Sequence, residues 1–149
     1  MKSDKGILWI FGALAAVLCL MFFATDLPLG FLSGGAPKPV PGKVYELTAE
    51  NMGVARRVPV LVALFTRNGN MDGTRMSRML PSLAERIKDR AIVASGNLDQ
   101  EPDLASKVDL KELPTWVFYR DGREVTRSSG EHADISLNRL IQEVTGKAP

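Results

Sequence analysis

The chain has 149 residues, a length that allows one ordinary domain with an appendage. Its formal net charge of +2 at pH 7 is too small to indicate nucleic-acid binding. Its one cysteine, Cys19, excludes an intramolecular disulfide, a CxxC redox pair and a cysteine-rich zinc site. The hydrophobic fraction of 45% is ordinary, but much of it is concentrated near the N-terminus.

Residues 6–24 form an uncharged apolar run, GILWIFGALAAVLCLMFFA, of about the length that crosses a hydrocarbon core as a helix. We therefore expect an uncleaved membrane anchor. A signal peptide is the main alternative, but its apolar stretch is usually shorter and ends at a small-x-small cleavage site. In Phe22-Phe23-Ala24 a bulky residue, Phe22, stands where a small one is needed. Gly12 and Ala16 form a small-xxx-small pair that could let two such helices pack together, although ordinary small residues in a lone anchor are the simpler interpretation.

The charges on either side of the run predict its orientation. Two lysines lie in residues 1–5, whereas the first basic residue after the run is Lys38. The positive-inside rule then puts the N-terminus in the cytoplasm and the rest of the chain outside the inner or plasma membrane, in the periplasm or extracellular space. Residues 25–43, rich in proline and glycine, are expected to be an extended linker, and residues 44–149 a folded domain.

The folded domain alternates strand and helix patterns. The six apolar residues 60–65 predict a strand that is buried on both faces, and Asp121-Gly122 is typical of a hairpin turn. Apolar residues recur at helical spacing after a polar loop and again near the C-terminus. In chain order we expect strands at 44–47, 60–65, 91–95, 115–119 and 123–127, alternating with helices at 49–57, about 76–90, 102–108 and about 137–144.

This βαβαβαββα order, with a closing hairpin and a last helix, is similar to the thioredoxin fold, an α/β fold whose central mixed sheet is flanked by helices. Pro81 in the long helix resembles a proline at which the family's helix kinks. The most specific motif is Leu113-Pro114-Thr115 followed by residues 117–122, VFYRDG. It resembles the loop in which a cis-proline faces the active site, together with the start of the hairpin. The resemblance covers roughly residues 44–144.

The residues that carry the family's activity are missing. Counting back from Pro81, the resemblance places the two active-site cysteines at Gly73 and Met76, and the buried acid at Ala63. Neither a glycine nor a thioether can form a thiolate, which is the nucleophile of disulfide exchange. The loop before the long helix is also longer than the family's usual loop. We therefore expect a redox-inactive domain that is not an enzyme.

The cis-proline loop nevertheless suggests a binding face. In the family, the backbone beside this proline pairs with an extended peptide, a small case of strand addition. The resemblance then implies a cysteine-free face for a peptide or a partner protein. The alternative is that Pro114 only shapes the turn into its strand. The residues of the expected face are Met71, Asp72, Gly73, Met76, Leu113, Pro114 and Thr115.

Other chemistry has little support in the sequence. The stretch from Asn68 to Gly73 resembles the start of a calcium loop, but Met79 stands where a bidentate glutamate is needed. We expect no metal and no small-molecule cofactor. Asp72 or Thr74 is expected to cap the long helix, and His132 to be an ordinary surface residue.

The function that best fits these patterns is a membrane-anchored, redox-inactive thioredoxin-like domain. It would bind a protein partner, or serve as an accessory subunit of a membrane complex, on the extracytoplasmic side. One alternative is a folding helper that holds extended peptides for a separate thiol-disulfide oxidoreductase. Another is a scaffold whose anchor helix does the pairing through Gly12.

Overall fold

The computed structural model describes residues 36–130, 133 and 135–146, all within one compact unit that spans Ala36–Pro149. The expected anchor, with Gly12 and Ala16, lies outside the described residues, as does His132. Among the residues that are described, no helix combines the length and the apolar character needed to cross a membrane.

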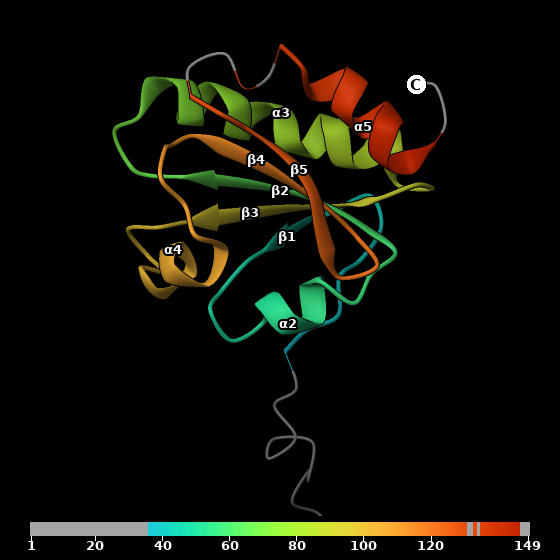
Figure 1. The fold of residues 1–149 in the computed structure, drawn as a ribbon, viewed down its shortest axis with the longest axis horizontal. Helices are drawn as coiled ribbons and strands as arrows, with labels where there is room; N and C mark the ends of the chain where they lie inside the picture. Colours follow the sequence, from blue (N-terminus) through green and yellow to red (C-terminus); the bar gives the residue numbers. More distant parts are fainter. Residues whose placement is uncertain (1–35, 131–132, 134, 147–149) are drawn as a thin grey trace, which may run out of the picture. The chain divides into compact units, whose positions relative to one another are not determined.

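The element order agrees with the sequence prediction (Figure 1). Five strands alternate with helices as expected, and the hairpin turn falls at Asp121 and Gly122, both with positive φ. That backbone shape suits the twist of two antiparallel strands. The elements are β1 Val44–Glu46, α2 Met52–Ala55, β2 Val60–Thr66, α3 Met71–Ile87, β3 Ile92–Asn97, α4 Asp103–Val108, β4 Thr115–Arg120, β5 Arg123–Ser129 and α5 Leu137–Thr145.

The strands form one mixed sheet in the order β1-β3-β2-β4-β5. β1, β3 and β2 are parallel to one another, whereas β4 runs antiparallel to both β2 and β5. β2 lies at the centre, and every one of its residues is buried, because helices cover both faces of the sheet there.

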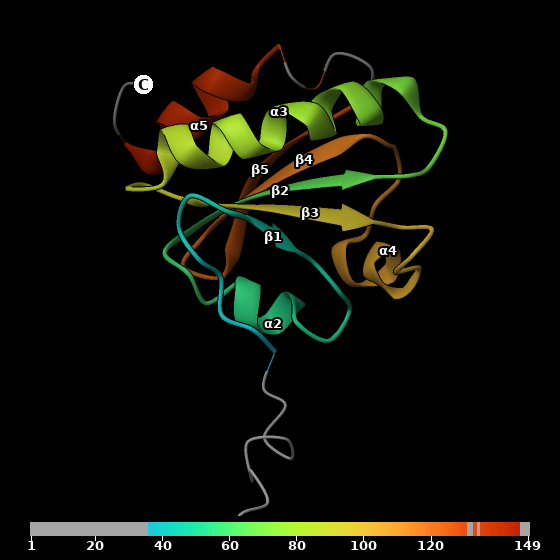
Figure 2. The same ribbon diagram turned by 180° about the vertical axis from the view of Figure 1, so that it is seen from behind.

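The helices lie in two layers, α3 and α5 on one face of the sheet and α2 and α4 on the other (Figures 1 and 2). Alternate residues of β2 therefore enter different cores. Val62 and Leu64 pack with the apolar sides of α3 and α5, whereas Leu61 and Phe65 pack with the short helices. This alternation follows from the two-residue period of a strand.

Two helices differ from the expected ranges. The helix expected at 49–57 is reduced to α2, because Thr48 and Asn51 hold the preceding residues in a turn. The Thr48 N–H donates to Asn51 Oδ1 at 2.9 Å, and the Asn51 N–H donates to Thr48 Oγ1 at 3.2 Å. The second difference, the start of α3, changes the candidate site and is described next.

Candidate functional site

The candidate site lies at the end of the sheet where β2 and β3 finish and β4 begins. The β2–α3 loop, the β3–α4 loop and the residues before β4 meet there. In open α/β sheets, ligands commonly bind at the carboxyl ends of the parallel strands. The residues of the expected face lie at this end of the sheet.

The long helix begins earlier than the sequence predicted. α3 starts at Met71, so only residues 67–70 connect it to β2, and the expected longer loop is wrong. The cap is Asn70, not Asp72 or Thr74: Asn70 has an extended backbone, and its Oδ1 accepts from the Gly73 N–H at 2.7 Å. Asparagine is among the strongest capping residues, because its oxygen satisfies an N–H that has no partner inside the helix.

Asn70 also reaches the loop that precedes β4. Its Nδ2 donates to the Leu113 carbonyl at 3.4 Å, so one side chain joins the start of α3 to that loop. The Leu113-Pro114 peptide bond is cis, as the resemblance implied. The Leu113 N–H makes no hydrogen bond with another described residue. Among the described residues, Leu113 thus has a backbone donor without a partner beside a carbonyl whose one contact is long.

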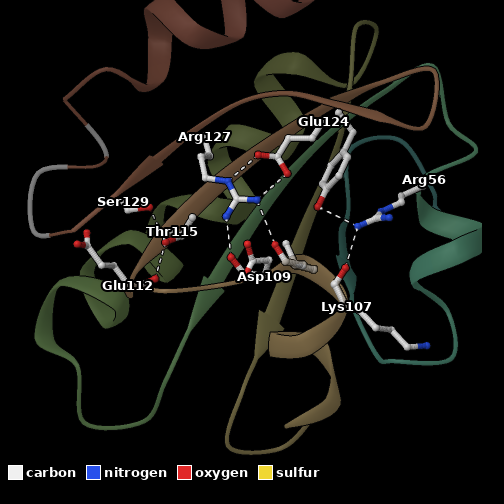
Figure 3. Close-up of polar contacts among 10 residues, drawn as sticks. Arg56, Lys107, Asp109, Glu112, Thr115, Glu124, Arg127 and Ser129 are labelled. Carbon is white, nitrogen blue, oxygen red and sulfur yellow. Dashed lines mark hydrogen bonds and ion pairs between the residues drawn. The ribbon is translucent and has the colours of Figure 1, made fainter.

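The residues after Leu113 are fixed from within the protein. The Pro114 carbonyl accepts from the Gly130 N–H at 2.9 Å. The Thr115 hydroxyl donates to the Glu112 carbonyl at 2.6 Å, and its oxygen lies 2.9 Å from Ser129 Oγ, which can donate to it in return (Figure 3). Thr115 is 1% exposed, so its side chain shapes the loop from below.

The β2–α3 loop is held by a second set of polar contacts. The Asp99 carboxylate accepts from the Asn68 N–H at 2.8 Å and pairs with Arg67 at 3.2 Å. Asn97 donates to the Asn68 side chain at 2.8 Å. These contacts come from the last residue of β3, Asn97, and from Asp99 in the β3–α4 loop, so neighbouring segments at this end of the sheet support each other.

Arg127 of β5 holds the end of α4, the helix that leads into the site (Figure 3). Its guanidinium donates to the carbonyls of Val108 and Asp109 at 3.1 and 3.0 Å, and Glu124 binds it through both carboxylate oxygens at 2.6 and 2.7 Å. The same pairing raises the pKa of Arg127. A cation at these carbonyls completes a short helix that has few hydrogen bonds of its own.

A second arginine supports α4 from the neighbouring helix. Arg56 lies 4.8 Å from the centre of the Tyr119 ring, and its Nη2 is 3.4 Å from the Tyr119 hydroxyl and 3.5 Å from the Lys107 carbonyl. Burial raises the pKa of the Tyr119 hydroxyl, and Arg56 opposes that rise. Arg56 and Arg127 therefore connect α2 and β5 to the same helix end.

The expected face is divided between the surface and the core. Gly73, Met76, Pro114 and Thr115 are buried, and Met76 is 0% exposed in the cluster beneath α3 and α5. Its thioether therefore cannot contact a partner in this conformation. Met71 is 86% exposed, and Asp72 and Leu113 are partly exposed. Met71, Asp72 and Leu113, with Asn70 between the helix and the loop, form what we call the Leu113 edge.

The position where the resemblance places a nucleophilic cysteine is closely surrounded. A Cβ at Gly73 would lie 3.2 Å from Thr66 Cβ and Cγ2 and 3.4 Å from Asn70 Oδ1. Within the described ranges, no group of three or more acidic, histidine or cysteine side chains is placed to hold a metal ion. The exposed groups of this end include Met71 and the ion pairs Arg67–Asp99 and Arg75–Asp72.

Comparison with known proteins points to one family. A family model described as Thioredoxin matches residues 72–143. A thioredoxin variant from Halobacterium salinarum superposes with a TM-score of 0.63 at 24% identity, covering 76% of this chain and all of that one. The Malassezia sympodialis thioredoxin gives 0.63 at 16% identity, covering 75% and 98%. The chain is thus similar to thioredoxins in sequence over residues 72–143 and has their fold.

The curated relatives are thioredoxins as well, matched over part of their length. Thioredoxin-2 of Saccharomyces cerevisiae is 36% identical over 52 residues, which is 35% of this chain and 49% of the yeast protein. Chloroplastic thioredoxin Y1 of Arabidopsis thaliana is 28% identical over 69 residues, 46% of this chain and 38% of that protein. Against the thioredoxin of Alicyclobacillus acidocaldarius the match covers 66% of the relative.

These relatives correct one expectation. We expected a protein that is not an enzyme, but the thioredoxins it matches are oxidoreductases, so that exclusion conflicts with the superfamily. The sequence supports a narrower statement about the cysteines. The thioredoxin-like domain has glycine and methionine at positions 73 and 76, and the only cysteine of the chain is Cys19.

Sequence reasoning missed the residues that organise this site. Asn70 stands three residues before Gly73 in a position typical of a helix cap, but the asparagines and glycines around it favoured a loop. Asp99 and Arg127 gave no local signal. Their partners are 31 and 18 residues away, and only the fold brings them together.

Proposed function

We propose that this protein presents a thioredoxin-like domain from a membrane anchor and binds a partner protein through the Leu113 edge. The domain would act on the extracytoplasmic side, as an interaction module or an accessory subunit of a membrane complex. It would do so through binding rather than through a thiol of its own, since its folded part has no cysteine.

The observation that carries this proposal is the Leu113 backbone. Its N–H has no partner among the described residues, and its carbonyl has only the 3.4 Å contact from Asn70. An extended segment of a partner can accept from the first and donate to the second, which is strand addition over a single residue. The contacts of Thr115 and Arg127 hold this backbone in place, so little ordering is needed when a partner binds.

Met71 would add an apolar contact to these backbone hydrogen bonds. It is 86% exposed at the first position of α3, close in sequence to the cap residue Asn70. Methionine side chains are flexible and polarisable, so they adapt to partners of different shape.

A photo-crosslinking amino acid at Met71 in the full chain, expressed in its own membranes, tests this proposal. A matched control carries the same amino acid at Met79, which is 37% exposed on the same helix. We expect a defined adduct from position 71 and none from position 79. Equal labelling at both positions, or adducts unchanged when Leu113 is replaced by proline to remove its N–H, would count against the Leu113 edge.

The anchor is tested separately. We expect the full chain to remain in the membrane fraction during alkaline carbonate extraction, because about 20 apolar residues suffice to span a bilayer. Protease added from the extracytoplasmic side should reach the domain. Release of intact chain by carbonate would remove the anchor from the proposal without affecting the crosslinking result.

The alternative function is a folding helper for a separate thiol-disulfide oxidoreductase. The Leu113 N–H, which has no partner in the described part of the chain, favours it, because main-chain hydrogen bonds do not select a sequence. The helper predicts many extended client peptides with similar affinities, whereas the interaction module predicts one partner. The number of distinct adducts from position 71 separates the two functions.

A further inference from the structure

The sheet has a second end, opposite the Leu113 edge, that the proposed function does not use. β1, β2 and β3 all begin there, and β4 ends there before it turns into β5. In Figure 2 the arrowheads of β2 and β3 point away from this end. Residues 36–43 run from beside α2 to the start of β1 at this end (Figures 1 and 2), and the Pro37 carbonyl accepts from the Tyr45 hydroxyl on the way at 2.5 Å.

Each loop at this end has an exposed cation. Lys43 precedes β1, Arg57 lies just before β2, Lys88 lies between α3 and β3, and Arg123 follows the β4–β5 turn. Lys38 adds another exposed charge, and it lines a shallow hollow together with Lys43. We call Lys38, Lys43, Arg57, Lys88 and Arg123 the basic end.

Specific contacts hold these loops together. The Asp121 N–H donates to the Pro59 carbonyl at 2.9 Å, which places the turn that precedes Arg123 beside the loop that contains Arg57. A second hollow is lined by residues of three loops, among them Pro41, Pro59 and Lys88. The cations therefore project from adjoining loops at one end of the domain.

Little of this charge is neutralised. Lys88 pairs with Glu85 at 2.5 Å, but Lys38, Lys43, Arg57 and Arg123 form no ion pair with any described residue. Two acids, Asp89 and Asp121, lie in these loops, and the Glu85 carboxylate lies beside Gly42, which precedes Lys43.

The opposite end differs. Arg67 and Arg75 are each paired with an aspartate there. Three further acids lie in its loops and the start of α4, namely Glu101, Asp103 and Glu112.

We propose that the basic end binds the anionic surface of a phospholipid bilayer. Clustered lysine and arginine side chains are attracted to anionic headgroups, and the attraction adds up over the residues near the surface. The inference rests on the proposed anchor. A span that ends near residue 24 would keep Ala36 within roughly 40 Å of the bilayer, because an extended chain covers about 3.3 Å per residue. The Leu113 edge, at the other end of the sheet, would then face away from the lipid and towards a partner.

The test uses the full chain in vesicles. Cys19→Ser removes the native thiol, and a reporter fluorophore is attached either at Val125→Cys, which follows the turn at the basic end, or at Gln100→Cys, at the other end. Vesicles contain phosphatidylcholine alone or a two-to-one mixture with phosphatidylglycerol, and a headgroup-labelled lipid quenches the fluorophore. We expect strong quenching at position 125 with anionic lipid only, weak quenching at position 100, and loss of the difference in concentrated salt.

A charge-reversal variant and its matched control sharpen the result. Lys43→Glu, Arg57→Glu and Arg123→Glu together should abolish the quenching difference, whereas Arg78→Glu with Lys111→Glu, away from the basic end, should leave it intact. Circular dichroism checks that both variants fold. If one does not, the salt dependence of quenching in the chain without charge reversals tests the proposal instead. Quenching that is equal at both positions or indifferent to lipid charge overturns the proposal, as does a preference for a soluble acidic protein over the anionic vesicles.

Failure of the anchor is distinguishable from failure of the basic end. If carbonate releases the chain, co-sedimentation with the same two vesicle preparations measures surface binding directly. Binding to anionic vesicles that the triple reversal weakens at least about tenfold supports the basic end without an anchor. Equal sedimentation with neutral and anionic vesicles overturns it.

Discussion

The two faces of the sheet are covered by helices of different kinds. α3 and α5, of 17 and nine residues, bury rows of apolar side chains against one face. α2 and α4, of four and six residues, cover the other face with only two buried side chains each. A helix of one turn or so is not stable by itself, so the second pair needs support from outside.

That support comes from side chains that reach the ends of the short helices. Arg127 and Arg56 donate to carbonyls at the end of α4, and Lys107 donates from α4 to the Ala49 carbonyl before α2. Because the chain runs from α4 to Leu113, the same contacts also hold the Leu113 edge. The comparison teaches that apolar burial fixes α3 and α5, whereas polar side chains hold the short helices α2 and α4 in place.

The largest effects should come from deleting a buried leucine on either face. Leu83→Ala in α3 and Leu104→Ala in α4 remove side chains that are 2% and 0% exposed, and each should lower the free energy of unfolding by about 2–5 kcal/mol in denaturant titrations. Leu104→Ala should in addition speed amide exchange in residues 109–113 before global unfolding. Equal exchange of that segment in both variants would mean that α4 does not support the site.

The next effect separates polar support from ordinary surface charge. Arg127→Ala should lower the free energy of unfolding by about 1–2 kcal/mol, because two helix-end carbonyls and Glu124 lose a charged, partly exposed partner. The matched control is Arg139→Ala on α5, whose exposed pair with Glu143 at 3.8 Å should contribute less than about 0.5 kcal/mol. Similar losses in both variants would abolish the contrast between the two faces.

A smaller effect tests the two roles of Asn70. Asn70→Ala should destabilise the domain by about 1 kcal/mol through loss of the cap on α3. Asn70→Asp keeps the acceptor for the Gly73 N–H but removes the donor to the Leu113 carbonyl, so it should retain most of the stability. Thermal unfolding of the two variants checks this, and equal losses would show that the contact with Leu113 is the important one.

The smallest effect is a dependence on alkaline pH. Burial raises the pKa of Tyr119 above its ordinary value of 10.0, so folding favours the neutral phenol. This contribution is complete below pH 10 and is lost as the pH rises through the folded-state value. Tyr119→Phe should therefore unfold with a shallower fall in stability above pH 10, as measured by denaturant titration at several pH values. If stability fell with pH equally steeply in both proteins, Tyr119 would not be the cause of the alkaline dependence.

Regular patterns in the sequence were enough to predict most of the fold. The apolar run of β2, the helical spacing of Leu80 and Leu83, and the Asp121-Gly122 turn are local signals that the tertiary structure leaves unchanged. The order of elements followed from these patterns, and the cis bond before Pro114 followed from the resemblance to the thioredoxin fold. Both are confirmed.

The site itself was harder to predict, for physical reasons. Met76 was expected at the very start of the helix, next to the loop, and so on the binding face. The helix instead starts five residues earlier, at Met71, and the Met76 side chain is buried in the core. Arg127 looked like one more charge on an exposed strand. Its role depends on the end of α4, which lies beside it only in the folded protein.

The most direct test of the account is hydrogen exchange at the Leu113 amide in the full chain, with and without an extended peptide that contains no cysteine. The Leu113 N–H has no partner among the described residues, so it should exchange readily in the free protein and become at least about tenfold slower when the peptide is bound. Unchanged exchange at Leu113 under conditions where the peptide is demonstrably bound would contradict the proposal that this backbone is where partners bind.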